Sequence, residues 1–231
     1  MGRTIYFHHS ARFFAILLLL LIFVTGLIFL GAVSVAFANI GFTPITIFLI
    51  LACTLFGSTI NIPLIKIKAV VPIIREEYVR YLWMTYRVPY VEYETAITTV
   101  AINVGGALIP SAVSLYLLSK AEPLIMFYSL IGVAVVALFT YAVARPVKGV
   151  GIVTPAFLPP LAAAAMALFL SPVQPHIIAY VSGVLGTLIG ADLLNLGSIP
   201  KLGAPIASIG GAGTFDGVFL SGIIAVLLVG L

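Results

Sequence analysis

The chain has 231 residues, of which 62% are hydrophobic and only 8% are charged, with a formal net charge of +4 at pH 7. A soluble domain usually has about 25% charged residues, and a chain this short could not bury so much apolar surface in its own core. The composition therefore excludes an ordinary soluble domain and makes the lipid bilayer the expected surroundings. The basic residues are scattered between apolar runs, so we predict no nucleic-acid partner.

Seven apolar runs follow one another along the chain. A membrane-spanning helix needs about 20 predominantly apolar residues. The first run could be a signal peptide, but its apolar core of about 25 residues exceeds the usual length of about 7–15, so we expect an uncleaved helix. The sequence therefore predicts an all-α polytopic membrane protein, with one transmembrane domain over residues 1–231 and about seven transmembrane helices. The predicted spans are 13–37, 45–62, 96–118, 125–143, 150–170, 177–196 and 214–231.

The distribution of Lys and Arg predicts the orientation, because basic residues gather in cytoplasmic connections. With the N-terminus inside, only Lys120 falls outside. The other ten fall inside: Arg3, Arg12, Lys66, Lys68, Arg75, Arg80, Arg87, Arg145, Lys148 and Lys201. We therefore expect a multi-pass protein of the cell membrane, with its N-terminus in the cytoplasm and its C-terminus outside.

The longest connection, residues 63–95, is expected at the cytoplasmic face. Residues 60–68 partly alternate between apolar and polar, as a strand would, and residues 76–94 interleave Tyr and Trp with Arg and Glu. This pattern fits an interfacial helix or strand at the level of the lipid headgroups, which could include a short hairpin. It also fits a surface that guides a partner or substrate toward the membrane.

A second connection, residues 197–213, is rich in glycine and proline and has little charge. We expect it to be cytoplasmic or re-entrant, since irregular backbone at membrane depth must be buried or line a watery cavity. Gly210, Gly211 and Gly213 would let a ligand or an extended peptide approach the backbone closely.

The only two aspartates, Asp192 and Asp216, lie near the cytoplasmic ends of the sixth and seventh predicted spans. An ionisable group in a span costs about 2.5–3.5 kcal/mol, which makes it a functional-site hypothesis. Two carboxyl groups at one depth can share a proton, and so can activate a water, or carry a proton or cation. Alternatively, each aspartate has a structural role only, in which it caps a helix or joins two helices. Four side chains are expected to give the pair polar support: Asn61, Asn103, Asn195 and Thr214.

Four segments resemble an uncharacterised family of archaeal and bacterial polytopic membrane proteins, which implies a prokaryotic plasma membrane and brings no known activity. They are residues 60–64, 103–110, 190–196 and 210–217.

The placement of the two aspartates also resembles the intramembrane aspartyl proteases of the presenilin and signal-peptide-peptidase type, which implies that Asp192 and Asp216 are catalytic. The chain departs from the motifs of those proteases, with Ala191 before the first aspartate and Phe215 directly before the second.

The leading hypothesis is an intramembrane aspartyl hydrolase that cleaves a membrane-embedded peptide. One alternative is a small transporter or channel in which the same aspartates bind a proton or cation. Another is a structural membrane subunit without catalysis. We expect no cofactor and no metal site, because the adjacent His8 and His9 have no Cys or carboxylate near them in the sequence.

Overall fold

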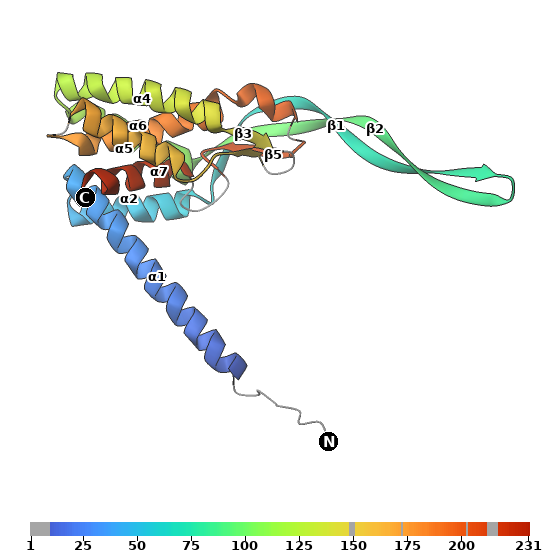
Figure 1. Ribbon diagram of the computed structural model, residues 1–231, viewed down its shortest axis with the longest axis horizontal. Helices are drawn as coiled ribbons and strands as arrows, with labels where there is room; N and C mark the ends of the chain where they lie inside the picture. Colours follow the sequence, from blue (N-terminus) through green and yellow to red (C-terminus); the bar gives the residue numbers. More distant parts are fainter. Residues whose placement is uncertain (1–9, 148–150, 172, 202, 212–216) are drawn as a thin grey trace.

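The computed structural model describes residues 10–147, 151–171, 173–201, 203–211 and 217–231. In these ranges the chain forms α helices, strands in two sheets, and short helical turns (Figure 1). The helices are α1 (Ser10–Ile40), α2 (Pro44–Gly57), α3 (Ile109–Lys120), α4 (Pro123–Val143), α5 (Leu158–Leu170), α6 (Pro175–Thr187) and α7 (Gly217–Val229). The strands are β1 (Asn61–Tyr81), β2 (Met84–Asn103), β3 (Arg145–Val147), β4 (Gly151–Val153) and β5 (Ile206–Ile209). The turns are η1 (Val104–Leu108) and η2 (Leu188–Leu193), both π-helical, and η3 (Leu196–Lys201), a 3-10 turn.

The prediction of an all-α fold with about seven transmembrane helices is wrong. Residues 61–103 are almost entirely strand. Apolar residues have the same hydropathy in a strand and in a helix, so hydropathy alone could not distinguish the two here. Each of the expected spans 45–62 and 96–118 combines a helix with one end of a long strand. Among the described residues, three helices are long and apolar enough to cross a membrane: Phe13–Ile40, Pro123–Val143 and Pro175–Leu193. Shorter apolar helices of 10–17 residues are Pro44–Gly57, Val104–Lys120, Leu158–Leu170 and Gly217–Val229.

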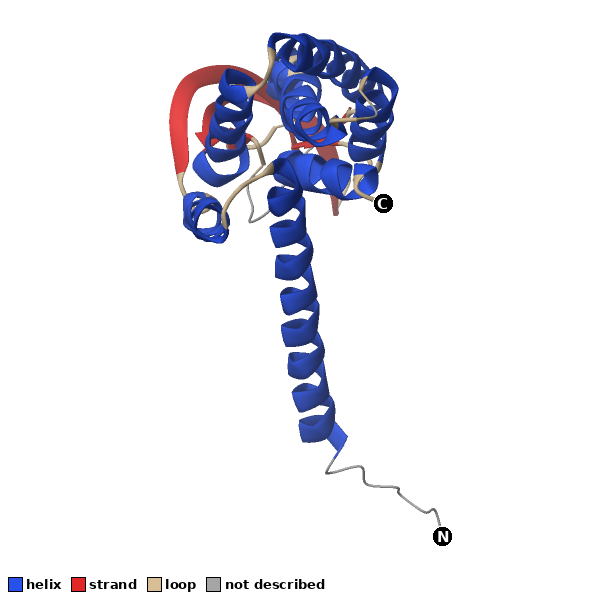
Figure 2. Cartoon of the chain, turned by 90° about the vertical axis from the view of Figure 1, so that its left-hand side faces the viewer, coloured by secondary structure: helices blue, strands red, loops and turns tan. Residues whose placement is uncertain are grey.

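Helix α6 packs against α4, α5 and α7 (Figure 1), in a helix bundle that Figure 2 views from its end. Ten of its 13 residues are buried. Glycines permit the close approach, because a Cβ at Gly183 would collide with the backbone of α7 and one at Gly186 would collide with Val136 of α4. The Gly-x-x-x-Gly pair, Gly186 and Gly190, therefore lies in a tight helix contact, as expected for small residues at such interfaces.

Helix α1 leaves the bundle at an angle and has its buried contacts near its C-terminal end (Figure 1). The Phe37 ring is fully buried there, with its centroid 5.7 Å from the ring of Tyr180 and 6.3 Å from that of Phe219. Most large apolar side chains from Phe13 to Ile28 are exposed. This exposed apolar surface suits a helix surrounded by lipid.

Strands β1 and β2 form one antiparallel hairpin that extends away from the bundle (Figure 1). Their β-branched and aromatic residues favour this conformation. The strands have 21 and 20 residues, so the segment 63–95, expected to be interfacial with at most a short hairpin, is the body of a long one. At its base, β5 pairs parallel with β2 over residues 99–102. Strands β3 and β4 form a separate small sheet.

Candidate functional site

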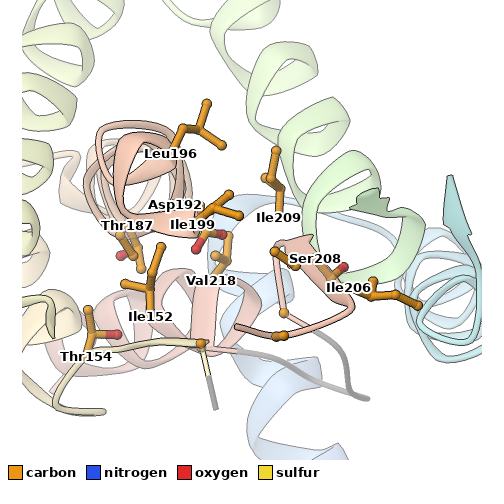
Figure 3. Close-up of a pocket in the computed structure, with 16 residues that line it drawn as sticks. Ile152, Thr154, Thr187, Asp192, Leu196, Ile199, Ile206, Ser208, Ile209 and Val218 are labelled. Carbon is orange, nitrogen blue, oxygen red and sulfur yellow. The ribbon is translucent and has the colours of Figure 1, made fainter. Parts of the chain in front are cut away.

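A cavity of about 180 Å³ lies where the helix bundle meets the sheet (Figure 3). Its walls come from β4, the end of α6, η2, η3, β5, the start of α7 and the loops beside the strands. Asp192 is the one charged side chain among the described residues that line it, and Thr154, Thr187 and Ser208 add hydroxyl groups. The cavity therefore brings one acid and several polar groups to an otherwise apolar part of the chain.

Asp192 lies on a π-helical turn that continues the helix begun as α6. After Thr187 the chain continues as the π-helical turn η2, which ends with the N–H of Leu194 donating to the carbonyl of Ile189 at 2.9 Å. Turns of this kind are rare and occur frequently at functional sites. Asp192 is half-buried on this turn and lies at the cavity (Figure 3).

The Asp192 carboxylate is held by the backbone that follows β5. Its Oδ2 accepts a hydrogen bond of 2.7 Å from the N–H of Gly210. Gly210 and Gly211 have φ angles of +78° and +76°, which favour glycine. A Cβ at Gly210 would also collide with Ala107 of η1. The Gly210 backbone therefore lies against the protein's own carboxylate and Gly211 lines the cavity, while the approach of a ligand or peptide to these glycines stays a prediction.

Asn61 and Asn103, both predicted as polar support, hydrogen-bond to each other at 3.2 Å at the base of the hairpin. Asn103 is fully buried, its Nδ2 also donates to the Ser58 carbonyl at 2.8 Å, and its Oδ1 accepts from the Gly106 N–H at 2.6 Å. The Ser208 hydroxyl donates to Asn61 Oδ1 at 2.6 Å. This network ties α2, the hairpin, η1 and β5 together, and it reaches the cavity through β5.

Asn195 was expected beside Asp192 on the same helix face. It is buried, and its Nδ2 donates instead to the carbonyl of Gly190 at 3.0 Å. Because the last carbonyls of a helix lack intrahelical partners, this side chain caps the C-terminal end of the helix Pro175–Leu193.

Three of the predicted site residues, Gly213, Thr214 and Asp216, lie outside the described residues, so the pairing of the two aspartates stays a prediction. The described residues on either side of that segment, Gly211 and Gly217, both line the cavity.

Sequence reasoning missed the hydroxyl groups of Thr154, Thr187 and Ser208. A lone hydroxyl in an apolar run is common and carries no signal of its own, and these three meet only through tertiary structure. Among the described residues, no three His, Cys, Asp or Glu side chains come together in a way that could hold a metal ion. His8 and His9 lie outside that part of the chain.

Residues 55–228 match the family described as "Protein of unknown function (DUF1614)". The chain belongs to this family. The match takes in the end of α2, the hairpin and nearly all of α7, so it includes every element that lines the cavity, whereas α1 lies outside it. The prediction of an uncharacterised family is confirmed, and the four segments that suggested it all fall inside the match. Comparison with curated proteins and with solved structures gives no match.

Proposed function

We propose that this family member is an intramembrane aspartyl hydrolase of the cell membrane, which cleaves a membrane-embedded peptide with Asp192 and Asp216 as its two carboxyl groups. The observation that carries the proposal is the position of Asp192, which lies in a cavity beside the outer edge of β5. The three helices that are long and apolar enough to cross a membrane support the membrane setting.

The edge of β5 supports a peptide as the substrate. In the described structure β5 pairs on one side only, with β2, and the carbonyl of Pro205 accepts from the N–H of Thr99. Because backbone groups alternate in direction along a strand, those of Ile206 and Ser208 point to the other side, as does the N–H of Gly210 that binds Asp192. An extended peptide added along this edge would therefore lie beside the carboxylate.

The chemistry needs two carboxyl groups around one water. One carboxylate takes a proton from the water as its oxygen bonds to the peptide carbonyl carbon, and the second, protonated carboxyl group donates to the carbonyl oxygen. Collapse of this intermediate breaks the C–N bond, and the leaving nitrogen takes up a proton. The Gly210 N–H fixes the orientation of Asp192, and the second role falls to Asp216, the residue before Gly217 in the sequence.

The test is cleavage of a model transmembrane peptide by the purified full-length protein in lipid nanodiscs. Asp192→Asn keeps an oxygen that can accept from the Gly210 N–H, so it should fold while losing the acid–base function. We expect Asp192→Asn and Asp216→Asn each to lower the cleavage rate by at least about 100-fold, the lower end of general acid–base contributions. The matched control is Glu122→Gln, an exposed acid just before α4, which should cleave at the wild-type rate. Wild-type cleavage by either aspartate variant would refute the proposal.

A proton or cation transporter is the second candidate, and the π-helical turn that carries Asp192 favours it, because such turns in a membrane-length helix occur frequently at functional sites. The cavity, however, is lined by residues from one end of the bundle. Flux across proteoliposomes that is lost in Asp192→Asn, together with no peptide cleavage, would favour transport. Neither activity in the wild-type protein would favour a structural subunit.

A further inference from the structure

The tip of the β1–β2 hairpin, residues 78–87, has a composition that differs from the rest of the hairpin. These ten residues contain two arginines, Arg80 and Arg87, and no acidic residue. The acids of the hairpin lie behind the tip, at positions 76, 77, 92 and 94. Arg87 is paired with one of these acids, Glu76, with 3.3 Å between its guanidinium nitrogen and the carboxylate oxygen, so Arg80 is the tip's main positive charge and lies nearer the turn.

The apolar side chains of the tip are exposed. Leu82 and Trp83 form the two-residue turn and are 68% and 82% exposed, and Tyr78, Met84 and Tyr86 beside them are also exposed. Arg87 lies 5.4 Å from the centroid of the Tyr78 ring. An exposed apolar cluster of this kind on a projecting element marks an interaction surface.

The turn at the hairpin tip places a leucine at a backbone position that favours glycine or asparagine. Leu82 has a φ of +55°, and it is the non-glycine residue with a positive φ among those described. Two-residue hairpin turns favour Gly or Asn at such positions, and a bulky residue there costs stability. Strain that persists in this way points to a function for the side chain.

We propose that the hairpin tip binds an anionic lipid surface. Trp and Tyr prefer the level of the lipid headgroups, Leu and Met can enter the acyl region, and Arg80 can bind a lipid phosphate. The absence of acidic residues from positions 78–87 matches the negative charge of such a surface. This role is independent of the proposed hydrolysis.

Trp83 is the single tryptophan of the chain, so its fluorescence reports on the tip alone. The experiment uses the full-length protein in phosphatidylcholine nanodiscs, to which vesicles of brominated lipid are added. We expect vesicles that contain phosphatidylglycerol to shift the emission of Trp83 to the blue and to quench it, and pure phosphatidylcholine vesicles to do neither. Quenching by brominated phosphatidylglycerol placed in the nanodisc itself would also support the proposal, and would show that the tip reaches the host bilayer.

The variant Arg80→Gln tests the charge. Each basic residue near an anionic surface contributes about fivefold to binding, so this variant should bind anionic vesicles about fivefold more weakly. The matched control, Lys66→Gln, removes the same charge from an exposed position at the base of the hairpin and should bind like the wild type. Leu82→Gly should weaken binding although it relieves the turn.

Equal binding to both kinds of vesicle, or equal loss in the tip and base variants, would overturn the proposal. So would a fluorescence shift that follows protein concentration without vesicles, because that result assigns the tip to contact between copies of the chain.

Discussion

The buried Asn103 is the residue on which the connection between the helices and the hairpin most depends. Asn103→Ala removes the side chain that accepts from the Gly106 N–H and donates to the Ser58 carbonyl and to Asn61 Oδ1. Removing the partner of a buried polar group costs about 1–3 kcal/mol, and two backbone groups are affected, so the free energy of unfolding should fall by about 3 kcal/mol. Asn61 still accepts from the Ser208 hydroxyl, which limits the loss.

The assay is reversible unfolding of the purified protein in detergent, followed by circular dichroism. Asn103→Asp keeps the acceptor for Gly106 but loses the donor, so it separates the two halves of the network. Asn195→Ala is the control, because that side chain makes one hydrogen bond, to the Gly190 carbonyl, and its loss should cost about 1 kcal/mol. An Asn103→Ala protein within about 0.5 kcal/mol of the wild type, the range of an ordinary surface substitution, would refute this account.

Three further substitutions test the packing around the site by the same unfolding measurement. Gly190→Ala should lower the free energy of unfolding by about 1–3 kcal/mol, because its Cβ would collide with the backbone of α4. The control is Gly197→Ala, whose Cβ meets nothing within 4 Å and which should leave the stability unchanged. Equal effects of the two substitutions would contradict the close contact of Gly190 with α4. Phe37→Ala should lower the free energy of unfolding by about 3–5 kcal/mol, because it removes a fully buried ring, and Phe23→Ala, whose ring is exposed, should lower it far less. A small effect of Phe37→Ala would show that α1 is not anchored to the bundle at this ring. Ser208→Ala should cost about 1 kcal/mol through its lost hydrogen bond, and an unchanged protein would show that this bond adds nothing.

The sequence predicted the helical segments well where an apolar run stands alone, as in α4, because length and composition suffice there. It failed over residues 61–103, where strand and helix share the same hydropathy and only the pairing of β1 with β2 decides. Strand β5 has four residues and exists through its ladder with β2, so no local pattern could reveal it.

The candidate site was predicted in part. Asp192 was identified from its cost in an apolar run, and it does lie at a cavity. Asn61 and Asn103 were expected to hydrogen-bond to the aspartates. The hairpin brings these two residues face to face instead, and their bonds go to each other, to the backbone and to the Ser208 hydroxyl. The contact between Asp192 and Gly210 joins residues 18 positions apart and depends on the path of β5. The path of β5 is set by contacts between residues far apart in the sequence, so the local sequence does not predict it.

The hairpin connects its exposed tip to the candidate site through one continuous strand. Strand β2 continues from the tip to its pairing with β5, and at about 3.3 Å per residue its 20 residues span roughly 65 Å. The same strand therefore reaches from the exposed turn at Trp83 to the four residues paired with β5, and the residue after β5, Gly210, holds Asp192. The tip and the candidate site are thus the two ends of one hydrogen-bonded sheet.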